Sequence, residues 1–339
     1  MTPKQKGPSA GTGEAFIDHK RNESQKTLYQ NPPPTGNALD QNIEAFPDAI
    51  RAAGMEPPGL IAPGKWQRFP GAGKGASNRA GWCFLFPDGL GGCFGDFSSG
   101  LSRSWQAKRQ APFSPAEREW FRQQVAEARA KAEADRRKAQ EKAARRAGEI
   151  WQSTNPPDPR HPYLVRKGIA LFPETLVRQR GRSLVLPVTD FTGAITSLQF
   201  IAPDGTKRLL SGGRKQGCFI RVHGDTVSPS RAILCEGWAT GHTLAEDEPE
   251  ALVLSAIDAG NLEAVAMGAR DHWPLAERVI ACDDDRLTPG NPGATHARQA
   301  AIASGALLCL PKWPEGAPDT LTDFNDLVIW QRKRGARHG

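Results

Sequence analysis

Two short apolar runs, each ending in acidic residues, constrain the fold of this chain most. Residues 231–235 read Arg-Ala-Ile-Leu-Cys and lead into Glu236. Residues 278–282 read Arg-Val-Ile-Ala-Cys and lead into Asp283, Asp284 and Asp285. Such apolar, β-branched runs are typical of strands buried on both faces of a parallel sheet. We therefore expect the acidic side chains at the carboxyl edge of a sheet, where open α/β sheets bind their ligands.

Carboxylates gathered at one edge repel one another unless a cation lies between them. At about 4 Å and an effective dielectric near 20, each like-charged pair costs roughly 4 kcal/mol. Mg²⁺ removes that conflict, because it binds carboxylate oxygens together with substrate phosphates. Asp283 and Asp285 are one residue apart, so on an extended segment both side chains point the same way. The pattern predicts metal-assisted phosphoryl transfer; taken alone, the Asp run also fits a solvated turn.

The composition limits the partners and the cellular compartment that we expect for this chain. A formal net charge of +7 favours a polyanionic partner. The sequence has no run of about 18 apolar residues and no secretory signal at its start, so we expect no membrane span and a cytoplasmic protein. The six cysteines are scattered, and Cys235 and Cys282 lie inside the apolar runs. This distribution favours reduced, buried thiols over a disulfide framework.

The sequence of the first half of the chain predicts three segments with different structures. Residues 1–40 have little apolar periodicity and are expected to be disordered. Residues 41–108 are rich in Gly and aromatic residues, which predicts a small β module with strands near 66–69, 81–86 and 92–97. Residues 113–150, rich in Ala, Glu, Lys and Arg, predict a long charged linker helix with Ser114 as N-cap. We expect this helix to be a solvated spacer.

The second half of the chain is expected to form the larger folded region. Residues 151–228 are expected to form a basic α+β subdomain, with a short helix near 162–166 and paired strands at 183–188 and 195–200. Residues 229–331 alternate between strand and helix as a parallel sheet requires, and 332–339 form a basic tail. The strands are expected at 232–235, 251–256, 278–282 and 306–310, and the helices at 238–246, 260–272 and 293–304. The expected fold class is α/β.

The order of these motifs resembles a known family. Glu236-Gly237 and the Asp283-x-Asp285 pair, each after an apolar strand, resemble the Toprim domain, a metal-binding module of primases, topoisomerases and some nucleases. The segments 181–188 and 207–215 are similar to the basic subdomain that precedes Toprim in bacterial-type primases. The motifs E-G-W-A-T-G from Glu236 and T-D-F-N-D from Thr322 look like those of compact primases of phages and conjugative plasmids. The resemblance covers about residues 150–331 and implies a Toprim parallel sheet flanked by helices.

The resemblance implies an activity, a cofactor and partners. It implies a DNA primase that synthesises short RNA primers on single-stranded DNA from ribonucleoside triphosphates, in replication of a phage, plasmid or integrated element. A replicative helicase, if used, would be a separate protein. Glu236, Asp283 and Asp285 would be catalytic and bind Mg²⁺ or Mn²⁺, as two ions about 3.5–4 Å apart. Glu236 would either bind the second ion or move the proton of the attacking hydroxyl. Asp323 and Asp326 would bring further carboxylates near the metals, with helix capping as their alternative.

The resemblance also assigns the basic residues of the catalytic half. They would supply positive charge for nucleotide and template phosphates. This set consists of Arg180, Arg182, Lys207, Arg208, Arg214, Lys215 and Arg286. Asp258 and Asn261 follow another strand and are either helix-capping residues or residues at the rim of the site.

The N-terminal module departs from the family pattern. Bacterial primases carry a zinc ribbon here, which needs four Cys or His ligands. Only Cys83 and Cys93 are available, so we expect no zinc and a degenerate, ribbon-like fold held by aromatic residues. Its aromatic and basic residues fit either contact with single-stranded DNA or an ordinary small core. They are Trp66, Arg68, Phe69, Lys74, Arg79, Trp82 and Trp105.

Two other functions share the same acidic motif. A Toprim-type nuclease would cut phosphodiesters with the same metal ions, but nucleases of this type generally lack the basic subdomain. A non-catalytic single-stranded nucleic-acid-binding protein would keep the fold without the chemistry, and the intact set of Glu236, Asp283 and Asp285 speaks against it.

Overall fold

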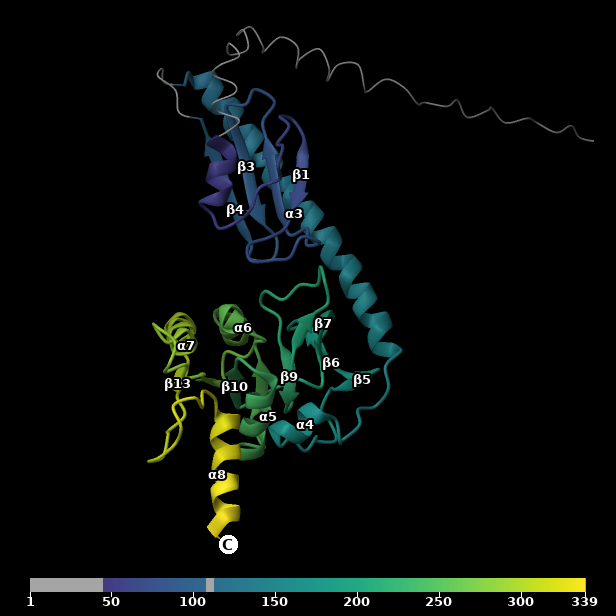
Figure 1. Cartoon of the computed structure of the whole chain (residues 1–339), viewed down its shortest axis with the longest axis vertical. Helices are drawn as coiled ribbons and strands as arrows, with labels where there is room; N and C mark the ends of the chain where they lie inside the picture. The colour runs from purple at the N-terminus through teal and green to yellow at the C-terminus, as the bar shows by residue number, and fades with distance from the viewer. Residues whose placement is uncertain (1–44, 108–112, 339) are drawn as a thin grey trace, which may run out of the picture. The chain divides into compact units, whose positions relative to one another are not determined.

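The computed structural model describes residues 45–107 and 113–338 as a mixed α/β protein (Figure 1). The chain divides into two compact units, Met1–Glu133 and Ala134–Gly339. The lead at residues 1–40, expected to be disordered, lies outside the described residues. None of the described helices is both long enough and apolar enough to cross a lipid bilayer.

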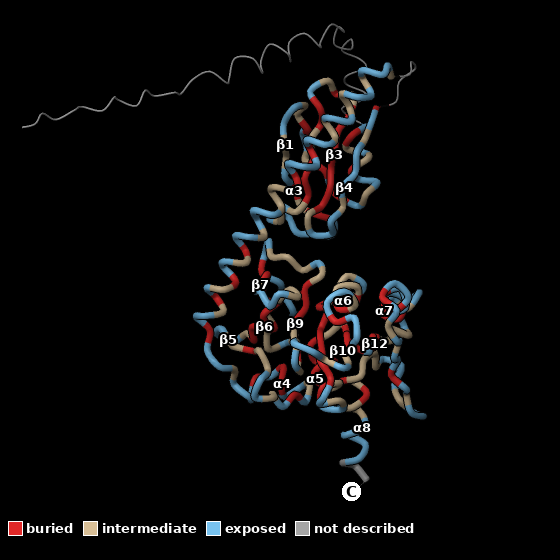
Figure 2. Tube along the Cα trace, turned by 180° about the vertical axis from the view of Figure 1, so that it is seen from behind, coloured by how far each residue is buried: buried red, intermediate tan, exposed pale blue. Residues whose placement is uncertain are grey.

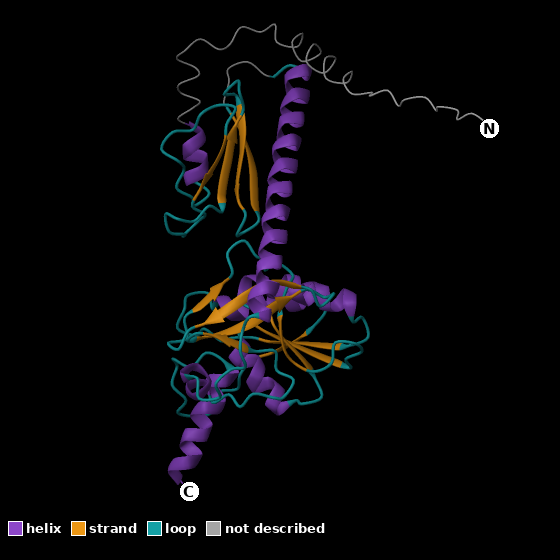
Figure 3. Cartoon of the chain, turned by 90° about the vertical axis from the view of Figure 1, so that its right-hand side faces the viewer, coloured by secondary structure: helices purple, strands orange, loops and turns teal. Residues whose placement is uncertain are grey.

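The first unit is built on an antiparallel sheet of four strands in chain order. The strands are β1 (Trp66–Phe69), β2 (Gly81–Leu85), β3 (Gly91–Asp96) and β4 (Leu101–Gln106). A helix at residues 45–51 covers one face and the beginning of α3 (Pro115–Gln152) the other (Figure 3). Side chains alternate along β2, because Cys83 packs with Phe46 in one core and Trp82 packs with Ala128 in the other.

The two cysteines of this unit face different cores. Cys83 lies in the cluster around Phe46, and Cys93 lies in the cluster around Trp82. Burial raises the pKa of the Cys83 thiol to about 12 and that of Cys93 to about 11. These thiols therefore behave as protonated core side chains, on opposite faces of one sheet.

Helix α3 is not the solvated spacer that its composition suggested. Ala128 and Ala132 are buried against the sheet of the first unit, and Ala147 and Ile150 are buried in a core of the second unit. Its start agrees with the expected capping box, since Glu117 N–H donates to Ser114 Oγ and Ser114 N–H donates to the Glu117 carboxylate. An alanine-lined face lets the helix approach its neighbours closely, and this packing was not evident from the charged composition.

The second unit contains a smaller antiparallel sheet that precedes the main one. Its strands, in spatial order, are β5 (Arg178–Arg180), β6 (Ser183–Thr189), β7 (Ile195–Ile201) and β8 (Lys207–Leu209). The short helix α4 (Pro162–Lys167) leads into this sheet. The edge strand β8 is exposed along its whole length, which presents Lys207 and Arg208 to solvent.

The main sheet has five strands in the order β13-β12-β10-β11-β9. Its elements are β9 (Ile220–His223), β10 (Arg231–Cys235), β11 (Leu252–Ser255), β12 (Glu277–Ala281) and β13 (Leu307–Cys309). Strands β10 to β13 are parallel and β9 is antiparallel, so the sheet is mixed rather than purely parallel. The central strands are buried along their length (Figure 2).

Helices cover both faces of the main sheet. Helix α5 (Trp238–Asp247) packs in the core on one face, and α6 (Ala259–His272) and α7 (Pro292–Ser304) pack on the other. The last described helix is α8 (Phe324–His338), which contains residues 332–338 of the segment expected to be a basic tail. From β10 the chain passes to β11 on one side, and β12 then returns on the other side of β10. The strand order thus switches direction at β10 and β12, where doubly wound sheets place their ligand sites.

Candidate active site

The structure brings Glu236 and Asp283 together at the carboxyl edge of the main sheet. Strands β10 and β12 are hydrogen-bonded in parallel with Cys235 opposite Ala281, so Glu236 and the Asp283 turn leave the same edge. The carboxylates lie close enough for each to influence the ionisation of others in the group. This arrangement follows from the apolar strands, because parallel strands in register end at the same edge.

Asp283 lies at the centre of the carboxylate group. Burial raises its pKa to about 8, with further contributions from the charges of Glu236, Asp323 and Asp285. Its Oδ1 atom is buried and has no hydrogen-bond partner among the described residues. A buried acceptor without a donor is costly in a native protein. The atom is therefore suited to bind a cation or a proton.

The charged form of Glu236 is also disfavoured, but a nearby lysine and a backbone N–H partly offset this effect. Burial raises its pKa, and the charges of Asp258 and Asp285 raise it further. Lys207 and the backbone N–H of Ala259, at the start of α6, act in the opposite direction. The Lys207 ammonium lies 3.9 Å from the position that a Cβ atom on Gly237 would occupy. Lys207 is thus the predicted basic residue that the structure places beside these acids.

Asp285 lies against the start of α7. Its Oδ2 accepts a hydrogen bond from Gly293 N–H at 3.2 Å, and its own N–H donates to Asn291 Oδ1 at 2.9 Å. A Cβ atom on Gly293 would come within 2.8 Å of the Asp283 carbonyl oxygen and 3.0 Å of Asp285 Oδ2. Only glycine allows α7 to approach the acidic turn this closely, and the helix N-terminus favours the Asp285 charge.

Asp323 and Asp326 have different positions. Asp323 caps α8 by accepting the Asp326 N–H at 2.7 Å, and its Oδ2 accepts the Thr240 hydroxyl at 3.2 Å. Its charge also raises the pKa of Asp283, so it lies near the group. Asp326 is inside α8 rather than in a loop, and it pairs with Lys167 at 3.0 Å. Lys167 also lies 4.0 Å from Asp323 Oδ2, so Asp323 combines capping with proximity to Asp283, and Asp326 is the closer partner of the lysine.

The carboxylates suit a divalent cation with oxygen ligands. In the described part of the chain, no group of three or more His, Cys, Asp or Glu side chains has an arrangement that could hold a metal ion. Asp283 Oδ1 is nevertheless buried without a donor, and the pKa values of Asp283 and Glu236 are raised. The negative charges of these carboxylates are therefore not fully neutralised by other groups of the protein. Mg²⁺ and Mn²⁺ bind such oxygens and retain several waters, so a partly formed ligand set fits them.

The other predicted basic residues divide into two groups. Three are held within the protein: Arg214 pairs with Asp190 at 2.5 Å, Lys215 with Asp258 at 2.6 Å and Arg286 with Asp319 at 3.1 Å. The others are exposed. This second group consists of Arg180, Arg182, Lys207 and Arg208. The exposed group retains the freedom to meet phosphates, and the paired group contributes first to the architecture of the site.

Sequence reasoning left the role of Asp258 open, and the structure places it beside Glu236. Its side chain makes no capping hydrogen bond to α6 and pairs with Lys215. Ile257 before it has a φ of 79°, a strained conformation for a β-branched residue. Asn261 is buried and binds backbone groups of Gly217 and Cys218, so its role is structural. A positive φ at isoleucine has no sequence signal.

The aromatic residues of the set that could contact DNA pack in the two cores of the first unit, whereas the basic residues of that set are exposed. Phe69 and Trp82 are buried, and Trp66 stacks on Trp82 with ring centroids 4.8 Å apart. Lys74 and Arg79 are exposed on the loop that joins β1 to β2. The ordinary-core interpretation thus accounts for Phe69 and Trp82.

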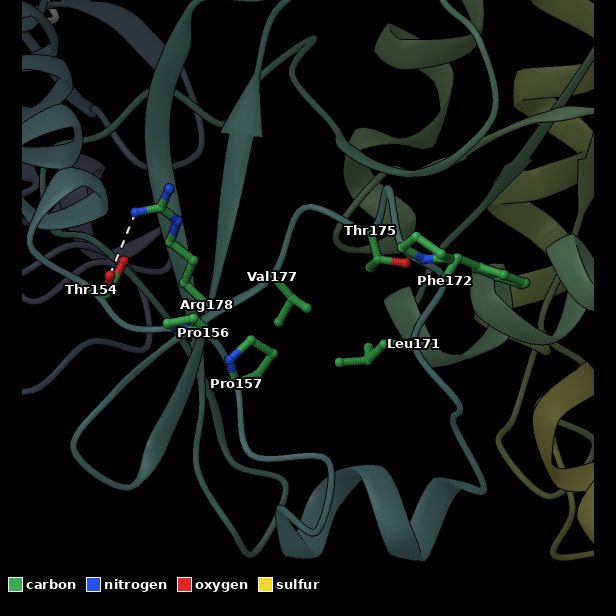
Figure 4. Close-up of a pocket in the computed structure, with 9 residues that line it drawn as sticks. Thr154, Pro156, Pro157, Leu171, Phe172, Thr175, Val177 and Arg178 are labelled. Carbon is green, nitrogen blue, oxygen red and sulfur yellow. Dashed lines mark hydrogen bonds between the residues drawn. The ribbon is translucent and has the colours of Figure 1, made fainter.

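One cavity of the second unit lies away from the acids. It has a volume of about 420 Å³, and Figure 4 shows Pro156, Pro157, Leu171 and Phe172 in its lining. Arg178 at its edge donates to the Thr154 carbonyl at 3.5 Å. No lining residue belongs to the carboxylate group.

Comparisons with known proteins point to one class of protein. No family model matches the chain. It is 32% identical over 321 residues to a DNA primase TraC of Escherichia coli, covering 91% of this chain and 29% of that protein. A second Escherichia coli DNA primase TraC is 34% identical over 283 residues, covering 79% of this chain and 19% of that protein. The chain thus spans less than a third of the length of these relatives.

Solved structures with some likeness are also primases. The DnaG primase catalytic domain bound to ssDNA has a TM-score of 0.37 at 13% identity, over 60% of this chain and 78% of that one. The primase fragment of the bacteriophage T7 primase-helicase protein has a TM-score of 0.32 at 15% identity, over 52% of this chain and 68% of that one. The resemblance to primases noted in the sequence is confirmed by the sequence relatives: this chain is related to part of DNA primase TraC along most of its length.

Proposed function

We propose that this chain is a DNA primase that joins ribonucleotides on a single-stranded DNA template by metal-dependent nucleotidyl transfer. The observation that carries the proposal is the convergence of Glu236 and Asp283 at the carboxyl edge of neighbouring parallel strands. The relationship to TraC primases supports the same activity.

The reaction joins the 3′-hydroxyl of one nucleotide to the α-phosphate of the next, with pyrophosphate as the leaving group. Asp283, Asp285 and Glu236 would hold Mg²⁺ or Mn²⁺, with Asp323 nearby. When bound, two such ions would favour ionisation of the 3′-hydroxyl and neutralise charge on the pyrophosphate.

Other steps of the reaction, proton transfer and phosphate binding, would be carried out by side chains of the protein. Glu236, whose pKa is raised, is suited to accept the proton of the attacking hydroxyl. Lys207, exposed on β8 beside Gly237, is positioned to contact a nucleotide phosphate. Arg208, Arg180 and Arg182 are exposed and would meet the template or nucleotide phosphates.

A priming assay tests this proposal. The full chain is incubated with single-stranded DNA, labelled ribonucleoside triphosphates and Mg²⁺ or Mn²⁺, and short RNA products are resolved by size. We expect products with the wild type and a loss of at least about 100-fold in Asp283→Asn and Glu236→Gln. Asp271→Asn, an exposed aspartate near the end of α6, is the matched control and should retain activity.

Other outcomes would favour the other functions. Shortened input DNA without new RNA, abolished by Asp283→Asn, would indicate a nuclease. Binding of single-stranded DNA with a steep salt dependence, but neither product, would indicate a non-catalytic binding protein.

A further inference from the structure

The middle aspartate of the acidic turn differs from its neighbours in its contacts. Asp284 Oδ1 accepts a hydrogen bond from Asn291 Nδ2 at 2.8 Å, and Oδ2 accepts one from Trp313 Nε1 at 2.8 Å. Its backbone N–H donates to the Thr322 carbonyl at 2.7 Å. Both carboxylate oxygens are therefore engaged within the protein, in contrast to the unpartnered Oδ1 of Asp283.

Arg286 joins the same turn to the loop before α8. Its guanidinium pairs with Asp319 at 3.1 Å and donates to the carbonyls of Pro318 and Leu321, each at 3.2 Å. It also lies over the Trp313 ring, 4.6 Å from the centroid. Its Nε atom is 3.6 Å from Asp284 Oδ2. One arginine thus connects the acidic turn with several points along residues 313–322.

These contacts end one residue before Asp323. Thr322, whose carbonyl accepts the Asp284 N–H, is followed directly by Asp323 at the start of α8. The Asp323 carboxylate accepts the Thr240 hydroxyl and the Asp326 N–H, lies 4.0 Å from the Lys167 ammonium, and its charge acts on Asp283. The loop before Asp323 therefore contributes, together with these groups, to how close Asp323 comes to Asp283.

We propose that Asp284, Arg286 and Trp313 are positioning residues that hold the Asp323 carboxylate beside Asp283 and so complete the divalent-cation site. This inference rests on the proposed function. It assigns Arg286 a role other than the phosphate contact expected from the resemblance, and it gives Trp313 a role that the sequence did not suggest. Residues that orient metal ligands typically change affinity 10- to 100-fold when altered.

Metal binding to the full chain, measured by calorimetry with Mn²⁺ alone, tests this without depending on primer synthesis. Trp313→Phe keeps an aromatic ring next to Arg286 and removes the N–H that binds Asp284. We expect Mn²⁺ affinity to fall about 10-fold. Trp330→Phe is the matched control: Trp330 lies in α8 with Arg334 against its ring, and the change should leave affinity unaltered.

A double-mutant comparison identifies Asp323 as the residue through which the contacts act. In an Asp323→Asn background, Trp313→Phe should cause no further loss of Mn²⁺ affinity, because the carboxylate it positions is gone. An equal loss in both backgrounds would overturn the inference. Wild-type affinity in the Trp313→Phe variant would do the same.

Two controls distinguish a failed positioning role from misfolding of a variant and from the absence of a metal site. Circular dichroism checks that each variant is folded, and if Trp313→Phe is not, Asp284→Asn takes its place with the same expectation. If the wild type binds no Mn²⁺, the metal site of the proposed function fails and the inference fails with it. If the wild type binds Mn²⁺ and the variants match it, only the positioning role is wrong.

Discussion

At the scale of single residues, the site keeps like charges together at a cost in stability. Burial and the charges of three neighbouring carboxylates raise the pKa of Asp283 to about 8, so the folded state disfavours its charged form. A carboxyl whose pKa rises on folding destabilises the native state at pH values above its unfolded pKa, and this penalty disappears below that pKa. A bound cation would remove the penalty.

Asp283→Asn should therefore stabilise the metal-free protein while abolishing priming. At pH 8 with a chelator, we expect the free energy of unfolding to rise, by up to about 5 kcal/mol, since the neutral amide avoids the charge that raises the pKa of Asp283 from 3.8 to about 8. Thermal melting of the variant beside wild type and Asp271→Asn measures this. A melting temperature equal to or below that of wild type would show that the carboxylates do not repel in the native state.

His242 gives a second residue-scale prediction, on pH. It is buried in α5 and stacks on Phe172, with Glu246 3.6 Å away, and burial lowers its pKa although Glu246 opposes the shift. The unfolded chain then binds more protons than the native state near and below pH 6.5, so stability falls as the pH drops through that range. The nearby imidazole of His223 acts in the same direction.

Urea unfolding at pH 7.5 and pH 5.5 measures this effect. His242→Gln should reduce the loss of stability between the two pH values, by less than about 1.4 kcal/mol per pH unit. His296→Gln changes an exposed histidine on α7 and should leave the wild-type difference intact. Identical pH dependence in the two variants would exclude a contribution from His242.

At the scale of elements, the approach of α7 to the acidic turn depends on one glycine. Gly293→Ala places a methyl group against the Asp283 carbonyl and Asp285 Oδ2, so α7 or the turn must shift. We expect destabilisation by about 1–3 kcal/mol and weaker Mn²⁺ binding. Gly148→Ala is the contrasting control, because that helical position in α3 has open space, and the change should stabilise by about 0.5–1 kcal/mol. Equal melting temperatures for the two variants would rule out the steric account.

The elements also show what the sequence could predict. The strands before Glu236 and Asp283 were expected within a residue of their observed bounds, because a buried parallel strand is apolar throughout. Strand β4 was missed, since Ser102, Arg103 and Ser104 are exposed and show no apolar alternation. The roles of Arg214, Lys215 and Arg286 depended on which acids the tertiary fold brings to them, and no local pattern encodes that.

At the scale of the whole molecule, the acids and the predicted phosphate-binding residues all lie in the second unit. Its two sheets supply them separately: the main sheet carries Glu236 and Asp283 at its carboxyl edge, and the smaller one carries Lys207 and Arg208 on an exposed edge strand. The relationship to TraC extends beyond this unit, because it covers 91% of the chain. Primer synthesis by this chain would require that these acids bind a divalent cation.

Anomalous X-ray scattering from a crystal of the full chain soaked in Mn²⁺ tests that dependence most directly. We expect an anomalous peak in contact with Asp283 Oδ1 and a neighbouring carboxylate of the group, and we expect no such peak in crystals of Asp283→Asn. Well-ordered Asp283 and Glu236 side chains with no peak between them, at Mn²⁺ concentrations that saturate binding in solution, would contradict it.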